Sequence, residues 1–401
     1  MAQTGSNIRV AFRVEASLNV APGTSGGEVF RLTPSPGLSC RKDAIRSNEI
    51  RDDGLSTIAR HGSQMVAGSY SGELSASSFN TALAAVARST QTAASTLTQA
   101  SVSLTNIVFG TNYVALTTTT STGGWVNAGI KVGDVFRITG SSATNNNVNA
   151  QVWAMTTHTL TVNTGAFTVE ATAVSAYSIT RGTKIFNADT VVRSSYYFEQ
   201  YQIDNDLSEV FGGCRFTGLT LNGSPNGMAD VAFSVMGLSA TALAAGASPY
   251  FTAPTEYTTG PLAFSDAFIG FDGARLTTAT AFSLSLDNGG ATLPVIGNTT
   301  SPDVFDGPAR LSGSLSFLRE DLDTLGDYTD EDELELFILL QAAMTAPKNY
   351  VGIYVPRIKI MGLDAPLGSD SALIETVSWE AGVKVAATGY DGCLFTVTTA
   401  A

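Results

Sequence analysis

The sequence is poor in the residues that build covalent cross-links and metal sites. Its 401 residues include three cysteines and two histidines, and charged residues make up 14% of the chain. Cys40, Cys214 and Cys393 have neither the number of a disulfide framework nor CxxC spacing, and neither histidine has a partner at metal-ligand spacing. We therefore expect buried thiols in a reducing compartment, no metal and no cofactor.

Motifs that carry catalysis are also missing from the sequence. It contains no P-loop and no GxGxxG, its one GxSxG match, Gly23–Gly27, is more simply a flexible turn than a nucleophile elbow, and His61 and His158 stand alone. The run Asp321–Gly326 begins like a calcium-binding EF-hand loop, but Leu325 and Asp332 occupy positions five and twelve, where ligands are needed. This pattern favours a solvated acidic loop. The sequence predicts no catalytic, metal or cofactor-binding residues, and we expect no enzyme.

An excess of basic charge and a long hydrophobic run are both lacking. There are 22 Lys and Arg against 35 Asp and Glu, a formal net charge of −13. Such a chain repels polyanions, so we do not expect a stable nucleic-acid complex, although a surface that nucleic acid passes without binding stays open. The stretches Val231–Ala245 and Leu334–Met344 are too short or too interrupted to span a bilayer, and the N-terminus is too polar for a secretory signal. These features predict a chain that folds in the cytoplasm and has no membrane partner.

The few charges are unevenly distributed. Between Ser89 and Thr180 the charged residues are Lys131, Asp134, Arg137 and Glu170. Short runs of strand-forming residues, separated by turn residues, occupy this region: Tyr113–Thr117, Val135–Thr139 and His158–Val162. They predict a small β-barrel or sandwich inserted into a larger domain, on the exterior of the protein.

The flanking regions are predicted to be mainly strands with two helices. Apolar residues alternate with polar or small ones from Ile8 to Val14, which is typical of a strand with one face on a core. Helical spacing predicts a first helix to Arg88, capped by Ser78. A second helix is expected from Thr329 to Met344, with four acidic residues in its first turn.

An internal repeat links the two flanks. Gly68-Ser69-Tyr70-Ser71 and Gly313-Ser314-Leu315-Ser316 are 245 positions apart (313 − 68), and Leu38-Ser39 and Ser283-Leu284 are related in the same way. Each motif follows a long polar loop, Ile45–Gln64 or Asp287–Ala309. We predict two tandem β-sandwiches, each with one flanking α-helix; chance similarity of Ser/Gly-rich strands is the alternative. The predicted boundaries are 1–95 plus 182–240 for the first copy, 96–181 for the insert, 241–254 for a linker and 255–401 for the second copy.

The order of six segments gives the chain a family resemblance. It resembles the major tail tube proteins of long-tailed, siphovirus-type bacteriophages, with an apparently duplicated tube fold. The segments that carry the resemblance are Phe12–Glu15, Val29–Leu32, Arg46–Arg51, Val66–Gly72, Gly218–Gly223 and Asp230–Gly237.

The resemblance implies a structural role in the phage tail. Family members fold as a β-sandwich with one helix, and the sheets of neighbouring subunits join into a barrel around a channel that conducts viral DNA into the host. The expected partners are other copies of the chain in stacked rings, the tape measure protein and DNA inside the channel, and the tail terminator and tail tip proteins. The chain is expected in the tail of the virion, after assembly in the host cytoplasm.

The resemblance also implies contact residues and a stoichiometry. The loop between the second and third strands reaches an adjacent ring, and here that loop is Ile45–Gln64. Its candidate inter-ring residues are Arg46, Glu49, Arg51, Asp52 and Asp53. Single-fold members form hexamers, so two folds in one chain favour a trimer with pseudo-sixfold symmetry over a hexamer.

Two other structural roles fit the composition. The chain could be a virion decoration protein or adhesin whose Thr/Asn-rich insert binds host-surface glycans through Trp125 and Trp153. It could also be another ring component, such as a tail terminator or a baseplate hub subunit. A tube subunit polymerises into long hollow filaments, whereas these alternatives do not.

Overall fold

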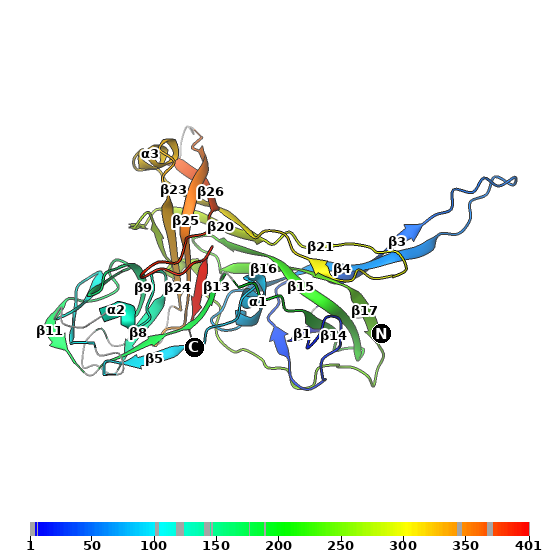
Figure 1. Ribbon diagram of the computed structural model, residues 1–401, viewed down its shortest axis with the longest axis horizontal. Helices are drawn as coiled ribbons and strands as arrows, with labels where there is room; N and C mark the ends of the chain where they lie inside the picture. The colour runs from blue at the N-terminus through cyan, green and yellow to red at the C-terminus, as the bar shows by residue number, and fades with distance from the viewer. Residues whose placement is uncertain are drawn as a thin grey trace.

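Strands dominate the fold, which confirms the predicted mainly-β class. The computed structural model describes residues 5, 7–100, 104–117, 124–139, 145, 147–175, 177–187, 190–342, 347–366 and 372–400. Figure 1 shows an elongated molecule in which a long hairpin leaves the body at one end and a compact unit lies at the other. Within the described residues, no helix is long and apolar enough to cross a membrane.

Two sets of eight strands build the body. The first set is β1 (Ile8–Val14), β2 (Glu28–Phe30), β3 (Gly37–Ile45), β4 (Arg60–Glu73), β14 (Tyr196–Gln202), β15 (Leu207–Gly223), β16 (Asp230–Gly237) and β17 (Ser239–Leu243). The second set is β18 (Phe268–Phe271), β19 (Ala274–Leu276), β20 (Ala279–Asp287), β23 (Arg310–Leu318), β24 (Leu334–Gln341), β25 (Tyr350–Asp364), β26 (Ile374–Ala381) and β27 (Thr396–Thr399).

The same seven pairings occur in both sets. In the first set β1 pairs with β2 and β14, β15 pairs with β14, β16 and β17, and β4 pairs with β3 and β16. In the second set β18 pairs with β19 and β24, β25 pairs with β24, β26 and β27, and β23 pairs with β20 and β26. We call residues that occupy the same pairing position in the two sets counterparts.

The counterparts agree down to single residues. Gly68 lies opposite Val235, and Gly313 lies opposite Trp379. The pairing of β15 with β16 shifts register between Phe216 and Gly218, and the pairing of β25 with β26 shifts between Ile360 and Gly362. Each shift is a β-bulge that ends in a glycine, so Gly218 and Gly362 are counterparts. The counterpart of Leu38 is Leu284, one residue beyond the predicted match.

One antiparallel junction joins the two sets into a long sheet. The carboxyl-terminal half of β15 pairs with β20, from Gly218 opposite Asp287 to Gly223 opposite Phe282. This long sheet has the strand order β3-β4-β16-β15-β20-β23-β26-β25. Its inner face and the other strands enclose a single apolar cluster, which contains residues from both sets and includes Phe12, Phe233 and Leu315.

Both predicted helices need correction. The first helix, α1, spans Asn80–Val86, and its N-cap is Phe79 rather than Ser78. The Ser78 hydroxyl is instead hydrogen-bonded to Ser75 and Thr259 inside the protein. The prediction of a helix from Thr329 to Met344 is wrong: α3 spans Asp323–Thr329, and Leu334–Gln341 forms β24. Residues 343–344 of that prediction lie outside the described residues.

The error has a clear physical cause. Five consecutive residues of β24, Leu336 to Leu340, are buried, because this strand is covered on both faces. A strand covered on both faces has a continuous apolar run, whose periodicity cannot be distinguished from that of a buried helix. The acidic residues before it therefore follow the carboxyl-terminal end of α3 and do not begin a helix.

The compact unit carries its own sheet. Its elements are β5 (Ser95–Thr98), β6 (Ile107–Phe109), β7 (Tyr113–Leu116), α2 (Gly124–Asn127), β8 (Val135–Thr139), β9 (Asn149–Met155), β10 (Thr159–Val162), β11 (Glu170–Val174) and β12 (Ser178–Arg181). The eight strands pair in the order β11-β6-β7-β10-β9-β8-β12-β5. They surround a second apolar cluster centred on Trp125, which is completely buried.

The compact unit packs against the second strand set. Phe337 of β24 and Tyr354 of β25 belong to its apolar cluster. Lys184, in β13 (Thr183–Phe186), forms ion pairs with Asp134 of the unit and with Asp391 near the C-terminus. Burial lowers the pKa of Lys184, but the two carboxylates outweigh it, so that the pKa is raised overall. These contacts attach the unit to β13, β24 and β25.

Candidate assembly surface

The outer face of the long sheet is covered by small side chains. Alternate residues along its strands are serine, threonine or alanine, and none of them is buried: Ala67, Ser69, Ser71, Thr220, Ala232, Ser234, Ser283, Ser285, Ser312, Ser314, Ser316, Thr376 and Ser378. The residues between them, such as Tyr70, Phe233 and Trp379, point into the core. Because side chains alternate between the two faces of a strand, the core fixes which residues form this small-residue face.

Charges on the small-residue face are sparse, and two of its basic groups lie opposite carboxylates, whereas Arg41 lies opposite Met65. Arg310 lies opposite Asp287 in the register, and Lys359 lies opposite Glu380. Glu73 faces Asp230 across β4 and β16, without a basic residue between them. Short hydroxyl side chains and few cations, most with a carboxylate opposite them, offer little to hold a polyanion, which needs Lys or Arg for binding.

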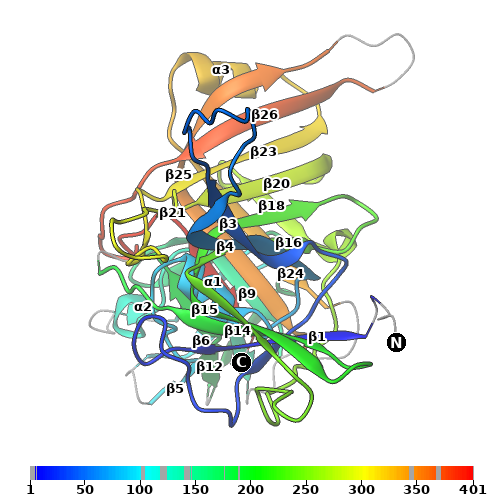
Figure 2. The same cartoon turned by 90° about the vertical axis from the view of Figure 1, so that its right-hand side faces the viewer.

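The β3–β4 hairpin extends far from the body as an arm, which we define as residues 46–59 with the strand ends that carry it (Figures 1 and 2). The arm places large aliphatic side chains in solvent: Ile50 is 97% exposed and Ile58 is 93% exposed. Single exposed apolar residues are ordinary, but two nearly fully exposed isoleucines on a protruding loop are typical of a surface that another molecule covers.

All five predicted contact residues lie on the arm. The structure brings two of them together, since Nη2 of Arg51 lies 2.6 Å from Oδ2 of Asp53. The hydrogen bond from Arg51 and one from the backbone N–H of Leu55 lower the pKa of Asp53. Within the described residues, the side chains of Arg46, Glu49 and Asp52 have no hydrogen-bond or ion-pair partner, so they are free to bind another subunit.

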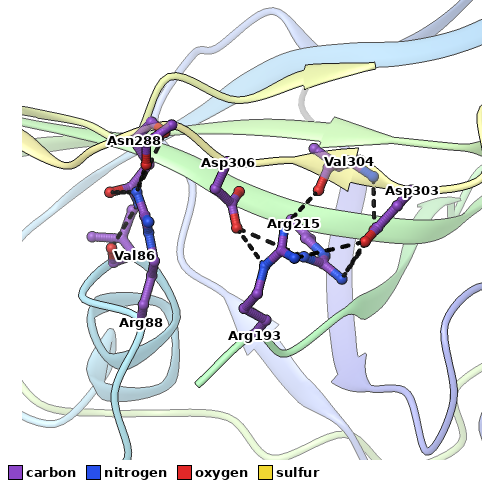
Figure 3. A network of polar contacts seen from close by, with 9 residues as sticks. Val86, Arg88, Arg193, Arg215, Asn288, Asp303, Val304 and Asp306 are labelled. Atoms are coloured by element: carbon purple, nitrogen blue, oxygen red, sulfur yellow. Dashed lines mark hydrogen bonds and ion pairs between the residues drawn. The ribbon is translucent and has the colours of Figure 1, made fainter. Parts of the chain in front are cut away.

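The second long loop has the opposite arrangement and folds back onto its own chain. It runs from residue 288 to 309, contains β21 (Ala291–Thr292) and β22 (Val304–Phe305), and extends from the end of the β15–β20 junction along β15 to β4, where the Gln64 N–H donates to the Thr299 carbonyl oxygen (Figures 1 and 3). We call it the clasp. Arg215 of β15 pairs with Asp303 at 3.0 Å, and Arg193 pairs with Asp306 at 2.9 Å.

The clasp is also held at the end of α1 (Figure 3). Arg88 donates to Oδ1 of Asn288 and to the carbonyl oxygen of Gly307, both at 2.8 Å. Asn288 in turn donates to the Val86 carbonyl oxygen, one of the last acceptors of the helix, at 2.8 Å. Burial lowers the pKa of Arg88. The absence of basic residues from Asp287–Ala309 indicated from the sequence that the two loops make different contacts, but it did not indicate that this loop binds Arg88, Arg193 and Arg215 of its own chain.

Comparison with known proteins identifies the family. The phage tail tube protein family matches residues 5–381, nearly the whole chain. The chain belongs to the phage tail tube protein family. No curated protein matches it. Membership makes the chain a structural protein of the tail of a bacteriophage virion, in a family that is not an enzyme family and whose members assemble into a tube with other tail proteins.

The structure also places the tryptophans that the sequence suggested for glycan binding and the side chains that could hold a metal. The described part of the chain holds no group of three or more Cys, His, Asp or Glu side chains placed to bind a metal. The two tryptophans considered for glycan binding are both in the core: Trp125 is fully buried, and Trp153 is 6% exposed. Neither indole presents a face on which a sugar could stack.

Proposed function

We propose that this chain polymerises as stacked rings around a channel that conducts viral DNA into the host, with the small-residue face lining the channel. One observation carries the proposal: both ends of the long sheet lack a partner strand within the described residues. At one end β3 pairs with β4 alone, and at the other Gly362–Asp364 pair with β26 alone. Exposed edges of this kind are a liability in a monomer and are removed when subunits close a barrel.

The recurrence of the seven pairings supports a duplicated tube fold, with copies at 1–95 plus 182–240 and at 255–401. Because a family ring is expected to contain six folds, three such chains would complete it. The insert, 96–181, would lie outside the tube, which fits its packing against β13 and β24, two strands that the long sheet does not include. The linker would be 241–254.

The arm is proposed as the inter-ring contact, through Arg46, Glu49, Arg51, Asp52 and Asp53. Its length and exposure support this role, as do the unpartnered charges and the isoleucines. Inside the channel, the tape measure protein and then DNA would pass; at the ends, the tube would meet the tail terminator and tail tip proteins. Assembly is expected in the host cytoplasm.

Electron microscopy of the purified chain tests the proposal. A tube subunit gives hollow filaments with a regular ring repeat, and a reconstruction shows whether a ring holds three chains or six. Protein that remains monomeric, or forms single rings at every concentration, would instead support a tail terminator. Replacing residues 46–59 by a two-residue turn should leave rings and abolish filaments, because it removes the proposed inter-ring contact and leaves the sheet edges.

A further inference from the structure

We propose that the internal junction between β15 and β20 is the template for the junction between chains, so that Cys40 of one copy lies opposite Leu363 of the next and Lys42 contacts Glu331. This inference rests on the proposed ring assembly and adds the register and the charges of its contact. The occupant of both free sheet edges is a second copy of this chain.

The register follows from counterparts. In the internal junction, Leu219 lies opposite Leu286. Leu286 pairs with Leu311 of β23 as Cys40 pairs with Val66 of β4, which makes Cys40 the counterpart of Leu286. Leu219 and Leu363 each follow the glycine of their bulge and are counterparts in the same way. Leu286 is 1% exposed, whereas Cys40 is exposed, so the prediction of a buried thiol is wrong for this cysteine. Its exposure fits a position that a neighbouring copy covers.

The bulge glycines provide independent support. A Cβ atom on Gly218 would lie 3.2 Å from the carbonyl oxygen of Leu286, so the internal junction disfavours a side chain there. Gly362 has the same place in its bulge, but a Cβ atom on it would meet nothing within 4 Å. Within one chain, a larger residue at position 362 would therefore cause no steric clash. A second copy in the proposed register would bring the backbone of Cys40 against it.

The residue that follows the helix has opposite charge at the two junctions. Arg88 follows α1 with a φ of 52°, and Glu331 follows α3 with a φ of 57°, so each occupies the left-handed position after its helix. In the internal junction Arg88 contacts Asn288, which directly follows Asp287, the last residue of β20. The counterpart of Asp287 is Arg41. The corresponding residue after Arg41 is Lys42. Glu331 already lies 3.3 Å from Lys359 of its own chain, but its side chain is 81% exposed, so Lys42 of the next copy would approach the same carboxylate. Arg88 contacts a polar residue in the internal junction. At the proposed junction between chains, Glu331 takes the place of Arg88 and would contact Lys42.

The surroundings continue this reversal. The strand ends at the base of the arm are basic, with Arg41, Lys42, Arg46 and Arg60 against one acidic residue, Asp43. The α3 side is acidic, and its carboxylates lie close together: after burial, the charges of Asp272, Asp332, Asp323 and Asp321 raise the pKa of Asp327. Charge complementarity fixes partner and register, and like charges oppose wrong pairings. The clasp of another chain is acidic, so it would be repelled by the acidic α3 side, to which the basic β3 edge is attracted.

Cross-linking of the full chain tests the register. Leu363→Cys, with the native Cys40, should form disulfide-linked oligomers on mild oxidation of assembled protein, up to a closed ring on a non-reducing gel. Cys214 and Cys393 are buried, so they contribute little background. The control Asp364→Cys points to the opposite face of the strand, and Leu363→Cys with Cys40→Ser lacks the partner thiol. Neither should cross-link.

The outcomes separate this inference from the proposed function. Filaments without cross-linking of Leu363→Cys, or with equal cross-linking of Asp364→Cys, would overturn the register and leave the tube role standing. A wild-type chain that forms no filaments at any concentration would overturn both. Gly362→Val is a further variant, expected to fold as wild type and to lose ring formation, and normal rings from it would contradict the close approach of Cys40.

A charge exchange tests the contact between Lys42 and Glu331. Lys42→Glu and Glu331→Lys should each raise the protein concentration needed for half-assembly by about tenfold. The double variant should return it most of the way to wild type. Lys348→Glu, the same charge change at an exposed site away from both edges, is the matched control. A double variant no better than either single one would overturn the contact.

Discussion

The indole of Trp153 stacks on the ring of Phe337, with the ring centroids 5.4 Å apart and 27° between the planes. This contact joins the insert to the second strand set, and Gly270 of β18 is needed beside it because a Cβ atom there would lie 2.6 Å from the indole. The insert is therefore attached by a packed apolar surface in addition to its two chain connections.

Deletion of the insert should need compensation. Replacing residues 96–181 by a Gly/Ser linker exposes Phe337 and Tyr354, and we expect aggregation and a lower melting temperature. Adding Phe337→Thr and Tyr354→Val should restore solubility and leave filament formation intact, since the insert is proposed to lie outside the tube. Solubility, melting temperature and microscopy measure the outcome. A simple deletion that behaves as wild type would contradict the importance of the packed surface.

Exchanging Arg51 and Asp53 should affect stacking and spare folding. Because these side chains pair with each other on the exposed arm, the double variant Arg51→Asp with Asp53→Arg keeps the local pair and reverses the charge presented to the next ring. We expect an unchanged melting temperature and short or absent filaments at low salt. Filaments of normal length would remove these residues from the inter-ring contact.

Loss of Arg215 should loosen the clasp. Arg215→Ala leaves the partly buried Asp303 with only Arg193, 3.9 Å away, and we expect a cost of about 2 kcal/mol, below the value for a fully buried pair that loses one partner. Chemical denaturation measures the loss, and limited proteolysis should show faster cleavage within 288–309. Arg310→Ala, an exposed arginine at the edge of the same loop, is the control and should change neither measurement by much.

The acidic cluster predicts a pH dependence in the free subunit. Because the pKa of Asp327 is raised on folding, the native state holds its proton more tightly, and its contribution to stability is lost as pH rises above the unfolded value. Asp327→Asn should melt higher than wild type at pH 7, by well under about 1 kcal/mol for so exposed a site, and the difference should vanish near pH 3. Glu256→Gln, outside the cluster, should show no such trend.

Lysines on the small-residue face should slow DNA transit. Ser69 and Ser314 are counterparts on this face, and both are half-buried between small neighbours. Ser69→Lys with Ser314→Lys should still allow tubes to form but reduce the rate of DNA ejection from assembled phage, because unpaired ammonium groups bind phosphate. The matched variant with asparagine at both positions adds bulk without charge, and ejection at equal rates from both variants would contradict the proposed lining.

Local patterns in the sequence predicted much of this fold. The alternation from Ile8 to Val14 matches β1 to the residue, and the Gly-Ser-x-Ser segments at Gly68 and Gly313 lie in strands that occupy the same pairing position. Both results depend on short-range periodicity, which a strand with one solvent face preserves.

Features that depend on distant contacts could not be predicted in this way. The junction of β15 with β20 pairs residues about sixty positions apart or more, from 59 (Gly223 with Phe282) to 69 (Gly218 with Asp287), and the pattern of β24 resembles that of a helix until the elements that cover both of its faces are known. The arm protrudes and the clasp packs on its own chain because Arg88, Arg193 and Arg215 all bind the clasp. These arginines are distant from the clasp in sequence, so no local pattern predicts that they meet there. The arm residues named from the sequence do lie together, but their partner is another molecule.

The covalent link between the two strand sets changes the kinetics of assembly. The β15–β20 junction forms when a single chain folds, so its rate and its stability do not depend on protein concentration. In a ring of three chains, every second junction would already exist before the first encounter between subunits. Dilution could then separate the ring at only half of its contacts, and a nucleus of ring growth would need fewer simultaneous collisions than one built from single-fold subunits.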